Sequence, residues 1–373
     1  MQKNETLYGK ENKRMKAAVC YEFGKPLVIE EVELLPPKTG EIQVKLAACA
    51  ICHSDILYAE GAWGGDLPAV YGHEAAGIVE SVGHGVKSFQ PGDHVLVTLI
   101  RSCGTCYYCT QGNRVRCETV FPLDEQFPLR TSYGKPIAQG LRTGAFAESV
   151  VVDVSQLAPI PEDIPLDSAS VLSCGVITGF GAVVNTAQIP TGCSVVILGT
   201  GGVGLNSVQG AAVTGAEKII ALDLSDAKLE AARNFGATHT VNVSQQKATK
   251  AVYGLTGGRG ADYVFVTVGA KSAIEQGFKL LGRGGTLVVV GMTANGVKIE
   301  FDSCKFASVE QRLLGSKMGS TRLETDIPWY NSLYQQGRLK LDELISGRYP
   351  LEQINEAISD VSQGNALRNV IVF

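Results

Sequence analysis

The sequence lacks the long apolar runs and the basic blocks that mark two large classes of protein. No apolar stretch approaches the roughly 18 to 20 residues that a membrane-spanning helix needs, so we expect no membrane span. The net charge is −4 and no basic block stands out, so nucleic acid is not an expected partner. The first 14 residues, MQKNETLYGKENKR, contain no hydrophobic segment. We therefore expect a frayed tail there, no signal peptide, and a cytoplasmic location.

Internal repeats and low-complexity tracts are also missing, and the remaining composition is that of an ordinary globular protein. The chain has 373 residues, of which 45% are hydrophobic and 19% are charged. This length exceeds a single compact core and suits two domains. In a reducing compartment, the ten cysteines are expected to be metal ligands or buried small apolar residues rather than disulfides.

A glycine-rich turn between an apolar run and a predicted helix is the feature around which the chain is organised. Residues 195–198 are continuously apolar, which is typical of a parallel strand covered on both faces. Gly199, Gly201 and Gly204 then match the pattern GxGxxG, and a helix is predicted over 203–214. Such glycines permit a tight turn, close approach to a pyrophosphate and close packing of helix on strand.

An acidic residue follows this motif at the distance expected for a dinucleotide site. Asp223 ends a second apolar run, residues 218–222, about 20 residues after the glycines. A carboxylate there accepts hydrogen bonds from the ribose hydroxyls of NAD and repels the extra phosphate of NADP. A Gly-rich turn in any α/β protein is the alternative, but strand, helix and acid together favour NAD binding.

Four closely spaced cysteines form the most specific motif in the chain. Cys103, Cys106, Cys109 and Cys117 have the spacing CxxCxxCx7C. Four thiolates can close a tetrahedral zinc site with no open position, which makes it structural. A ferredoxin-type iron–sulfur motif has a shorter last gap, usually followed by proline. A chance cluster, or a nucleic-acid-binding zinc knuckle with histidine and a basic surround, would also account for closely spaced cysteines.

Three more residues have the ligand types of an open zinc site. They are Cys52 in CHSD, His73 in GHE and Cys174 in SCGVITGFGA. Two thiolates and an imidazole leave one zinc position for substrate, as in catalytic sites. Each signal is weak by itself, because a lone cysteine or histidine is more often a buried structural residue.

These motifs together resemble those of the zinc-dependent medium-chain alcohol dehydrogenases, in the medium-chain dehydrogenase/reductase superfamily. The resemblance is carried by CHSD, GHEAAGIVESVG, the four-cysteine lobe, GKPI, CGVITGFGA, GTGGVG and RNVIVF. It is nearest to bacterial aryl or medium-chain primary alcohol enzymes. It implies hydride transfer between a primary alcohol, medium-chain aliphatic or aromatic, and NAD, which gives the aldehyde. Two zinc ions per chain are implied, one catalytic and one structural.

The implied fold class is α/β with two domains. A GroES-like β-rich catalytic domain would comprise residues 1–174, with the structural zinc lobe at 103–117. A Rossmann domain with a doubly wound parallel sheet would follow over 175–317, and residues 318–373 would return to the catalytic domain. Zinc and nicotinamide would meet in a cleft between the domains. The individual strands predicted in the first domain are 16–21, 42–48, 74–82 and 94–99.

The resemblance also implies roles for individual residues. Cys52, His73 and Cys174 would hold catalytic zinc. Glu74 would either contact these ligands without binding the metal or exchange with one of them as a ligand. Asp55 would orient His73, and Ser54 would take the alcohol proton. The implied coenzyme residues are His53 and Arg368 at the pyrophosphate, Thr178 and Val203 at the nicotinamide, Lys228 and Asp223 at the ribose, and Gly199, Gly201, Gly202, Gly204, Val268 and Val290. For Ser54, Thr178 and Val203, plain packing or turn formation is the alternative.

The substrate pocket and the oligomer follow from the same resemblance. Apolar residues Trp63, Leu99, Gly140, Leu141 and Met292 would line the pocket, with room opened at Gly140, which favours a medium aliphatic or aromatic alcohol over ethanol. The lengthened segment between Cys117 and Gly144 resembles dimeric members, so a homodimer is expected, with a homotetramer as the alternative. Leu57 stands where many relatives have a histidine that releases the proton to water.

Two alternative functions remain open at this stage. A thiol-adduct formaldehyde dehydrogenase of the same family would have an arginine four residues after the last lobe cysteine, where this chain has Phe121. A catalytically silent relative is the second alternative, although all three catalytic ligands and Ser54 are present.

Overall fold

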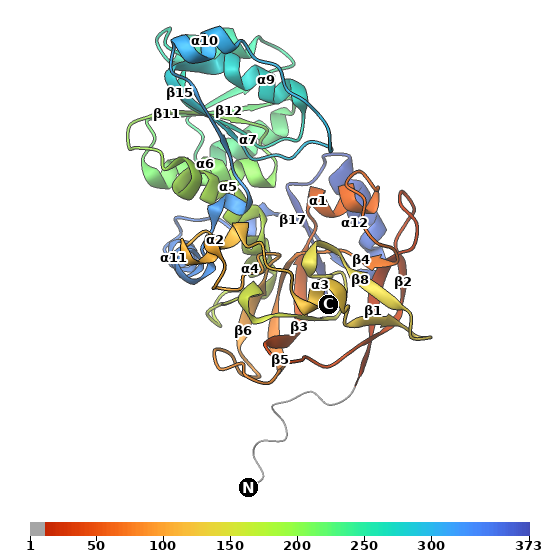
Figure 1. Ribbon diagram of the computed structural model, residues 1–373. Coiled ribbons are helices and arrows are strands. Elements are labelled where there is room, and N and C mark those ends of the chain that lie inside the picture. Colours follow the sequence, from red (N-terminus) through yellow and green to blue (C-terminus); the bar gives the residue numbers. More distant parts are fainter. Residues whose placement is uncertain (1–11) are drawn as a thin grey trace. The chain divides into compact units, whose positions relative to one another are not determined.

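The protein is described by a computed structural model that covers residues 12–373 (Figure 1). Contacts between Cα atoms divide the chain into two compact units. Among the described residues, unit 1 consists of 12–174, Arg322–Gly337 and Leu341–Phe373, and unit 2 of Gly175–Thr321 and Arg338–Lys340. The second boundary therefore follows Thr321 instead of residue 317. Of the predicted frayed tail, residues 1–11 lie outside the described residues, and Lys13 and Arg14 begin the first strand.

Unit 1 contains a closed β-barrel with the strand order β1-β2-β7-β8-β4. These strands are β1 (Lys13–Cys20), β2 (Val28–Leu34), β7 (Leu129–Thr131), β8 (Pro136–Gln139) and β4 (Ala69–Val70). In β1, charged Lys16 is exposed between buried Met15 and Ala17. This alternation directs one face of the strand to the core and the other to water.

A second sheet of unit 1 has the order β10-β6-β5-β3-β18-β17, and β9 pairs with β3. Its strands are β10 (Leu157–Pro159), β6 (His94–Val97), β5 (Glu74–Val82), β3 (Glu41–Ala50), β18 (Arg368–Val372), β17 (Ile345–Pro350) and β9 (Ser149–Asp153). The last strand of the chain is antiparallel to β3, with Val370 opposite Ala50. The carboxyl-terminal segment thus joins a sheet built mainly from residues 41–159.

Most helices of unit 1 are short, and they lie mostly in the connections between strands. They are α1 (His53–Ala59), α2 (Tyr107–Thr110), α3 (Pro122–Glu125), α4 (Leu166–Ser170), α11 (Leu323–Gln335) and α12 (Ile354–Ser362). Among residues 12–373 no single helix is long and apolar enough to cross a membrane, and one bent pair, Leu166–Ser173 with Gly175–Ala187, passes only by length and composition.

Unit 2 contains a parallel sheet in the doubly wound order β13-β12-β11-β14-β15-β16. Its strands are β13 (His239–Asn242), β12 (Lys218–Asp223), β11 (Ser194–Leu198), β14 (Ala261–Val266), β15 (Leu281–Val289) and β16 (Arg312–Gly315). The helices are α5 (Gly175–Gly181), α6 (Gly202–Thr214), α7 (Asp226–Asn234), α8 (Ala248–Leu255), α9 (Lys271–Leu280) and α10 (Ser303–Ser308). In Figure 1, α9 lies on one side of β11 and β12, and α6 lies on the other. The predicted α/β fold with a β-rich first part and a parallel sheet is confirmed.

Most regular segments predicted from the sequence match observed elements within a few residues. The strands predicted at 42–48 and 74–82 are β3 and β5, and the helix predicted at 203–214 is α6. The helix predicted to start at Trp329 begins earlier, at Leu323, and Pro328 lies inside it.

Candidate metal and coenzyme sites

Four buried residues of unit 1 bring their ligand atoms together. The sulfur, nitrogen and carboxylate atoms of Cys52, His73, Glu74 and Cys174 all lie within 4.8 Å of one another. Cys52 precedes α1 and follows the end of β3, and Glu74 begins β5 opposite Ala50. Sheet register therefore brings two ligand segments together, and the turn after Val171–Ser173 adds Cys174.

Asp55 fixes the orientation of His73. Its Oδ1 atom lies 2.9 Å from His73 Nδ1 and accepts the backbone N–H of Gly72 at 2.9 Å. The other oxygen accepts the N–H of Cys52 at 3.0 Å. A proton on Nδ1 leaves Nε2 as the ligand atom. Nε2 is buried and has no hydrogen-bond partner among the described residues, which is what a metal ligand requires.

The charges of this cluster also suit a divalent cation. A hydrogen bond with Cys174 lowers the pKa of Cys52 against the effect of burial, and the same bond, with burial, raises the pKa of Cys174. Burial is the main cause that raises the pKa of Glu74 to about 8. Two sulfurs and one imidazole nitrogen are typical donors for Zn²⁺, which replaces the thiol protons when it binds.

Arg368 lies buried beside this cluster and is not exposed to solvent as a free phosphate-binding side chain would be. Its Nη1 atom is 3.1 Å from Glu74 Oε1 and donates to the carbonyl of Ile51 at 3.1 Å. The arginine is 6% exposed. The pyrophosphate contact predicted for Arg368 would therefore compete with its ion pair to Glu74.

The lobe cysteines form the second cluster of ligand atoms. Those of Cys103, Cys106, Cys109 and Cys117 lie within 4.8 Å of one another. Hydrogen bonds from the side chains of Thr119 and Thr105 are the main causes that lower the pKa of Cys103 to about 5. A thiolate at neutral pH among four clustered sulfurs suits a closed tetrahedral metal site.

The glycine motif of unit 2 has the geometry of a phosphate-binding turn. β11 ends at Leu198, and α6 begins at Gly202. A side chain at Gly204 would lie 1.9 Å from the carbonyl oxygen of Gly199, so helix and strand pack too closely for any other residue. At Gly201, by contrast, a Cβ atom would meet nothing within 4 Å. The backbone of Gly201 is therefore open to a ligand at the amino end of α6.

Asp223 lies next to the glycine turn at the end of β12. Its Oδ2 atom accepts the backbone N–H of Thr200 at 2.8 Å and the Thr200 hydroxyl at 3.1 Å. Its Oδ1 atom accepts the N–H groups of Leu224 and Ser225. Sequence reasoning missed Thr200. The signal was a hydroxyl residue between the first two motif glycines.

The remaining predicted coenzyme residues differ in exposure. Val268 follows β14 and Val290 follows β15, so both lie past the carboxyl ends of parallel strands, at the same edge as Gly199. Their relative exposures are 37% and 7%. Half-buried Thr178 donates a weak hydrogen bond to the sulfur of Met318 at 3.7 Å. The others are Val203, half-buried in α6; Lys228, half-buried in α7; and His53, exposed at the start of α1.

One prediction about the substrate pocket is wrong. Gly140 does not open room, because a Cβ atom there would lie 2.2 Å from the ring atom Cδ1 of Tyr71. The aromatic ring fills the space that the glycine leaves. Trp63 packs edge-on against Tyr58, with ring centroids 5.2 Å apart. Leu99 and Leu141 are half-buried in unit 1, whereas Met292 belongs to unit 2 and is exposed.

The neighbouring turn has strained backbone. Leu141 and Arg142 have φ angles of 52° and 60°, in the left-handed region that residues other than glycine rarely adopt. Such residues cost of order 1–3 kcal/mol each and persist only where surrounding contacts hold them. The sequence contained no signal for this strain.

Known proteins match this chain over almost its whole length. Residues 38–162 match the family model described as alcohol dehydrogenase GroES-like domain, and residues 202–333 match zinc-binding dehydrogenase. An NDMA-dependent alcohol dehydrogenase of Amycolatopsis methanolica is 36% identical over 96% of this chain and 99% of its own length.

Solved structures are similar over almost the whole chain. An alcohol dehydrogenase zinc-binding domain protein from Burkholderia ambifaria has a TM-score of 0.93 and 35% identity, covering 97% of this chain and 100% of its own. Benzyl alcohol dehydrogenase from Acinetobacter calcoaceticus has a TM-score of 0.91 and 31% identity, covering 97% and 99%.

Proposed function

The chain belongs to the zinc-dependent medium-chain alcohol dehydrogenases, and from this premise we propose that it converts a primary alcohol, medium-chain aliphatic or aromatic, to the aldehyde with NAD. The observation that carries the proposal is the buried cluster of Cys52, His73 and Cys174, in which Nε2 of His73 has no hydrogen-bond partner among the described residues. Similarity to a benzyl alcohol dehydrogenase supports the aromatic class.

The chain's own residues would prepare the reaction. Cys52, His73 and Cys174 would hold the catalytic zinc, and Asp55 would keep His73 in the tautomer that ligates. Ser54 is half-buried in the first turn of α1, two residues after Cys52, and would accept the alcohol proton through its hydroxyl. When bound, zinc supplies Lewis-acid polarisation of the substrate oxygen, and NAD supplies the hydride acceptor.

The lobe cysteines would hold a second zinc with no part in the chemistry. Four thiolates leave no open position for substrate. Two zinc ions per chain would then differ in lability, because only the site at Cys52 is open.

A substrate screen tests the proposal. NAD reduction is followed over alcohols from C2 to C10, benzylic alcohols and terpenoid alcohols, with zinc measured by elemental analysis. We expect the highest kcat/KM with a medium-chain or benzylic primary alcohol and two zinc ions per chain. Zinc-loaded protein without turnover would instead indicate a catalytically silent relative.

Formaldehyde oxidation as a thiol adduct is the less favoured alternative. Where that subgroup has a carboxylate-binding arginine, this chain has Phe121, which is 9% exposed. Arg101 lies 5.6 Å from the Phe121 ring centroid, but it is 2% exposed and paired with Asp124. Neither side chain can therefore bind the carboxylate of an adduct.

Asp223 is expected to enforce the choice of NAD over NADP. In Asp223→Asn, the kcat/KM ratio of NAD to NADP should fall about tenfold to a hundredfold, since a charged hydrogen bond is worth about 1.5–3 kcal/mol. Asp226→Asn, an exposed change three residues along in α7, should leave the ratio unaltered. Asp223 also accepts the backbone N–H of Thr200, so its replacement can weaken the binding of both coenzymes. The ratio of the two kcat/KM values is therefore the readout. An unchanged ratio would contradict the assignment.

Leu57 is expected to limit proton release near neutral pH. Its half-buried side chain on α1 cannot accept or donate a proton. Leu57→His should therefore raise kcat/KM for alcohol oxidation near pH 7 several-fold and flatten its rise toward pH 10. Leu57→Asn, polar but without a titrating group, is the control. A deuterated alcohol checks whether hydride transfer limits the rate. Superimposable pH profiles of wild type and a zinc-replete Leu57→His would refute the expectation that Leu57 limits proton release.

A further inference from the structure

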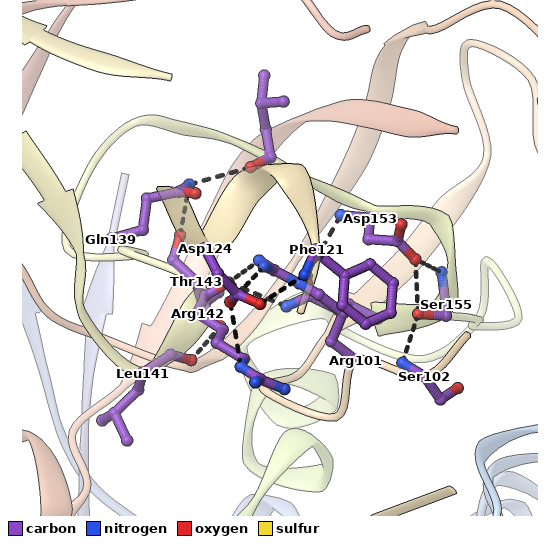
Figure 2. Close-up of polar contacts among 12 residues, drawn as sticks. Arg101, Ser102, Phe121, Asp124, Gln139, Leu141, Arg142, Thr143, Asp153 and Ser155 are labelled. Carbon is purple, nitrogen blue, oxygen red and sulfur yellow. Dashed lines mark hydrogen bonds and ion pairs between the residues drawn. The ribbon is translucent and has the colours of Figure 1, made fainter. Parts of the chain in front are cut away.

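Arg101 is a fully buried arginine that follows β6, and all of its guanidinium nitrogens are bonded. It is 2% exposed. Nε donates to Gln156 Oε1 at 2.7 Å, and Nη1 donates to Asp124 Oδ1 at 2.9 Å. Nη2 donates to the backbone carbonyl of Arg142 at 2.9 Å (Figure 2). A buried charge is costly unless it is paired and hydrogen-bonded in this way.

The partners of Arg101 are bonded to one another as well. Asp124 Oδ1 lies 3.3 Å from Nε of Arg142, and its Oδ2 accepts the backbone N–H of Phe121 at 2.9 Å. Gln156 Nε2 donates to the carbonyl of Arg142 at 3.1 Å. Two buried donors, from Arg101 and Gln156, therefore meet at this one carbonyl oxygen.

That carbonyl belongs to the strained turn Gly140–Arg142, called η2. Leu141 has φ 52° and Arg142 has φ 60°. Strain of this kind persists where surrounding contacts over-determine the backbone, and it is frequent at ligand-binding sites. The network around Arg101 supplies those contacts. Figure 2 shows the Leu141 side chain pointing away from the guanidinium group.

The turn lies beside the segments that contribute metal-ligand atoms. η2 packs against α1, which begins directly after Cys52. The backbone N–H of Ala145 donates to the carbonyl of Gly72, next to His73, at 2.9 Å. A third connection, after the η2–α1 contact and the Ala145–Gly72 hydrogen bond, starts at Gln156, which donates to the carbonyl of Thr98 at 2.9 Å.

This third connection continues to the segment that contains Cys174. The Thr98 hydroxyl donates at 2.7 Å to the carbonyl of Ser173, which precedes Cys174. Arg101 is thus connected through hydrogen bonds both to the turn containing Leu141 and to the backbone of the segment that precedes Cys174.

We propose that Arg101 is a positioning residue for substrate specificity, which holds Leu141 in place as a wall for the apolar part of a primary alcohol. The inference rests on the proposed alcohol oxidation. Arg101 itself does not touch the alcohol. It acts through Asp124, Gln156 and the carbonyl of Arg142, so its loss alters which alcohols are preferred.

The test compares Arg101→Lys with Arg130→Lys. Lysine keeps the charge but lacks the planar fork, so it cannot serve all three partners of Arg101. Arg130 also binds backbone carbonyls, those of Phe127 and Leu129, and is the matched control. We expect Arg101→Lys to reduce the ratio of kcat/KM for benzyl alcohol to that for ethanol at least fivefold. Zinc content and NADH affinity should stay at wild-type values, and Arg130→Lys should keep the ratio.

Hydrogen exchange gives a readout that is independent of activity. The N–H groups of Thr143 and Gly144 both donate to the carbonyl of Gly140, at 3.1 and 3.2 Å. In Arg101→Lys these two amides should exchange at least tenfold faster, with the amides of α6 unaffected. If Arg101→Lys is not recovered folded, the near-isosteric Asp124→Asn replaces it in both measurements.

The outcomes separate the inference from the proposed function. An equal loss of kcat/KM for all alcohols, or unaltered exchange at Thr143 and Gly144, would show a merely structural role and overturn the inference. A zinc-replete wild-type protein that oxidises none of the alcohols would overturn the proposed function, and the specificity role with it.

Discussion

Cys174→Ala is expected to lower kcat/KM for alcohol oxidation by about a thousandfold or more, since metal-ion catalysis contributes several kcal/mol. The change removes one of the two sulfur donors from a buried cluster whose ligand atoms lie within 4.8 Å of one another. Cys52 and His73 alone do not complete the three-ligand set of a catalytic zinc site. Zinc content should fall by one ion per chain, while the lobe zinc stays bound.

The matched control is Cys49→Ala. Cys49 is also buried, three residues before Cys52, but it is not in the cluster. This variant should keep both zinc ions and most of the activity. The measurements are kcat/KM with NAD and benzyl alcohol, zinc by elemental analysis and circular dichroism for the fold. A Cys174→Ala protein that retains two zinc ions or near-wild-type turnover would contradict the assignment of the open site.

Cys106→Ala is expected to have its largest effect on stability. Without one sulfur the lobe cannot close a tetrahedral site, and structural zinc contributes folding free energy directly. We expect a loss of one zinc and a fall in Tm of about 10 °C or more, at about 2–4 °C per kcal/mol for a domain of 150–250 residues. The lobe affects its surroundings because Ser102 donates to Ser155, and Arg114 forms an ion pair with Glu324.

Cys304→Ala is the control for this second prediction, because Cys304 is an exposed cysteine of unit 2 outside both clusters. Thermal unfolding and elemental analysis are measured on all three proteins. If Cys106→Ala unfolds at the wild-type Tm with two zinc ions bound, the lobe does not hold a structural metal. If its Tm falls while the zinc content is unchanged, the cysteine is important for packing alone.

Prediction from sequence succeeded where the determining interactions are local. The apolar run of β11, the three glycines and Asp223 lie within one continuous segment, and the structure forms strand, turn and helix there. A glycine with a positive φ, such as Gly199, has a steric reason contained in its own residue. The four lobe cysteines are likewise close in the chain, so their spacing alone indicated a common site.

The open site required more than spacing, because its residues are distant in the chain. Cys52, His73 and Cys174 were grouped in advance by ligand type and by resemblance to a family, and neither shows that they are close in space. The structure supplies a physical reason for their proximity: β3 pairs with β5 so that Ala50 faces Glu74, and Thr98 binds the carbonyl of Ser173. Backbone pairing between strands thus brings the ligand segments together.

The sequence by itself determined the α/β class, the dinucleotide motif, the lobe cysteines and the ligand types, because each depends on residue type and short-range periodicity. Only the tertiary structure decided that Tyr71 fills the space at Gly140, that Arg368 pairs with Glu74, and that buried Arg101 holds the strained turn at Leu141. These outcomes depend on which side chains compete for the same buried volume and hydrogen-bond partners. Residues far apart in the chain meet there, and their competition leaves no periodic trace in the sequence.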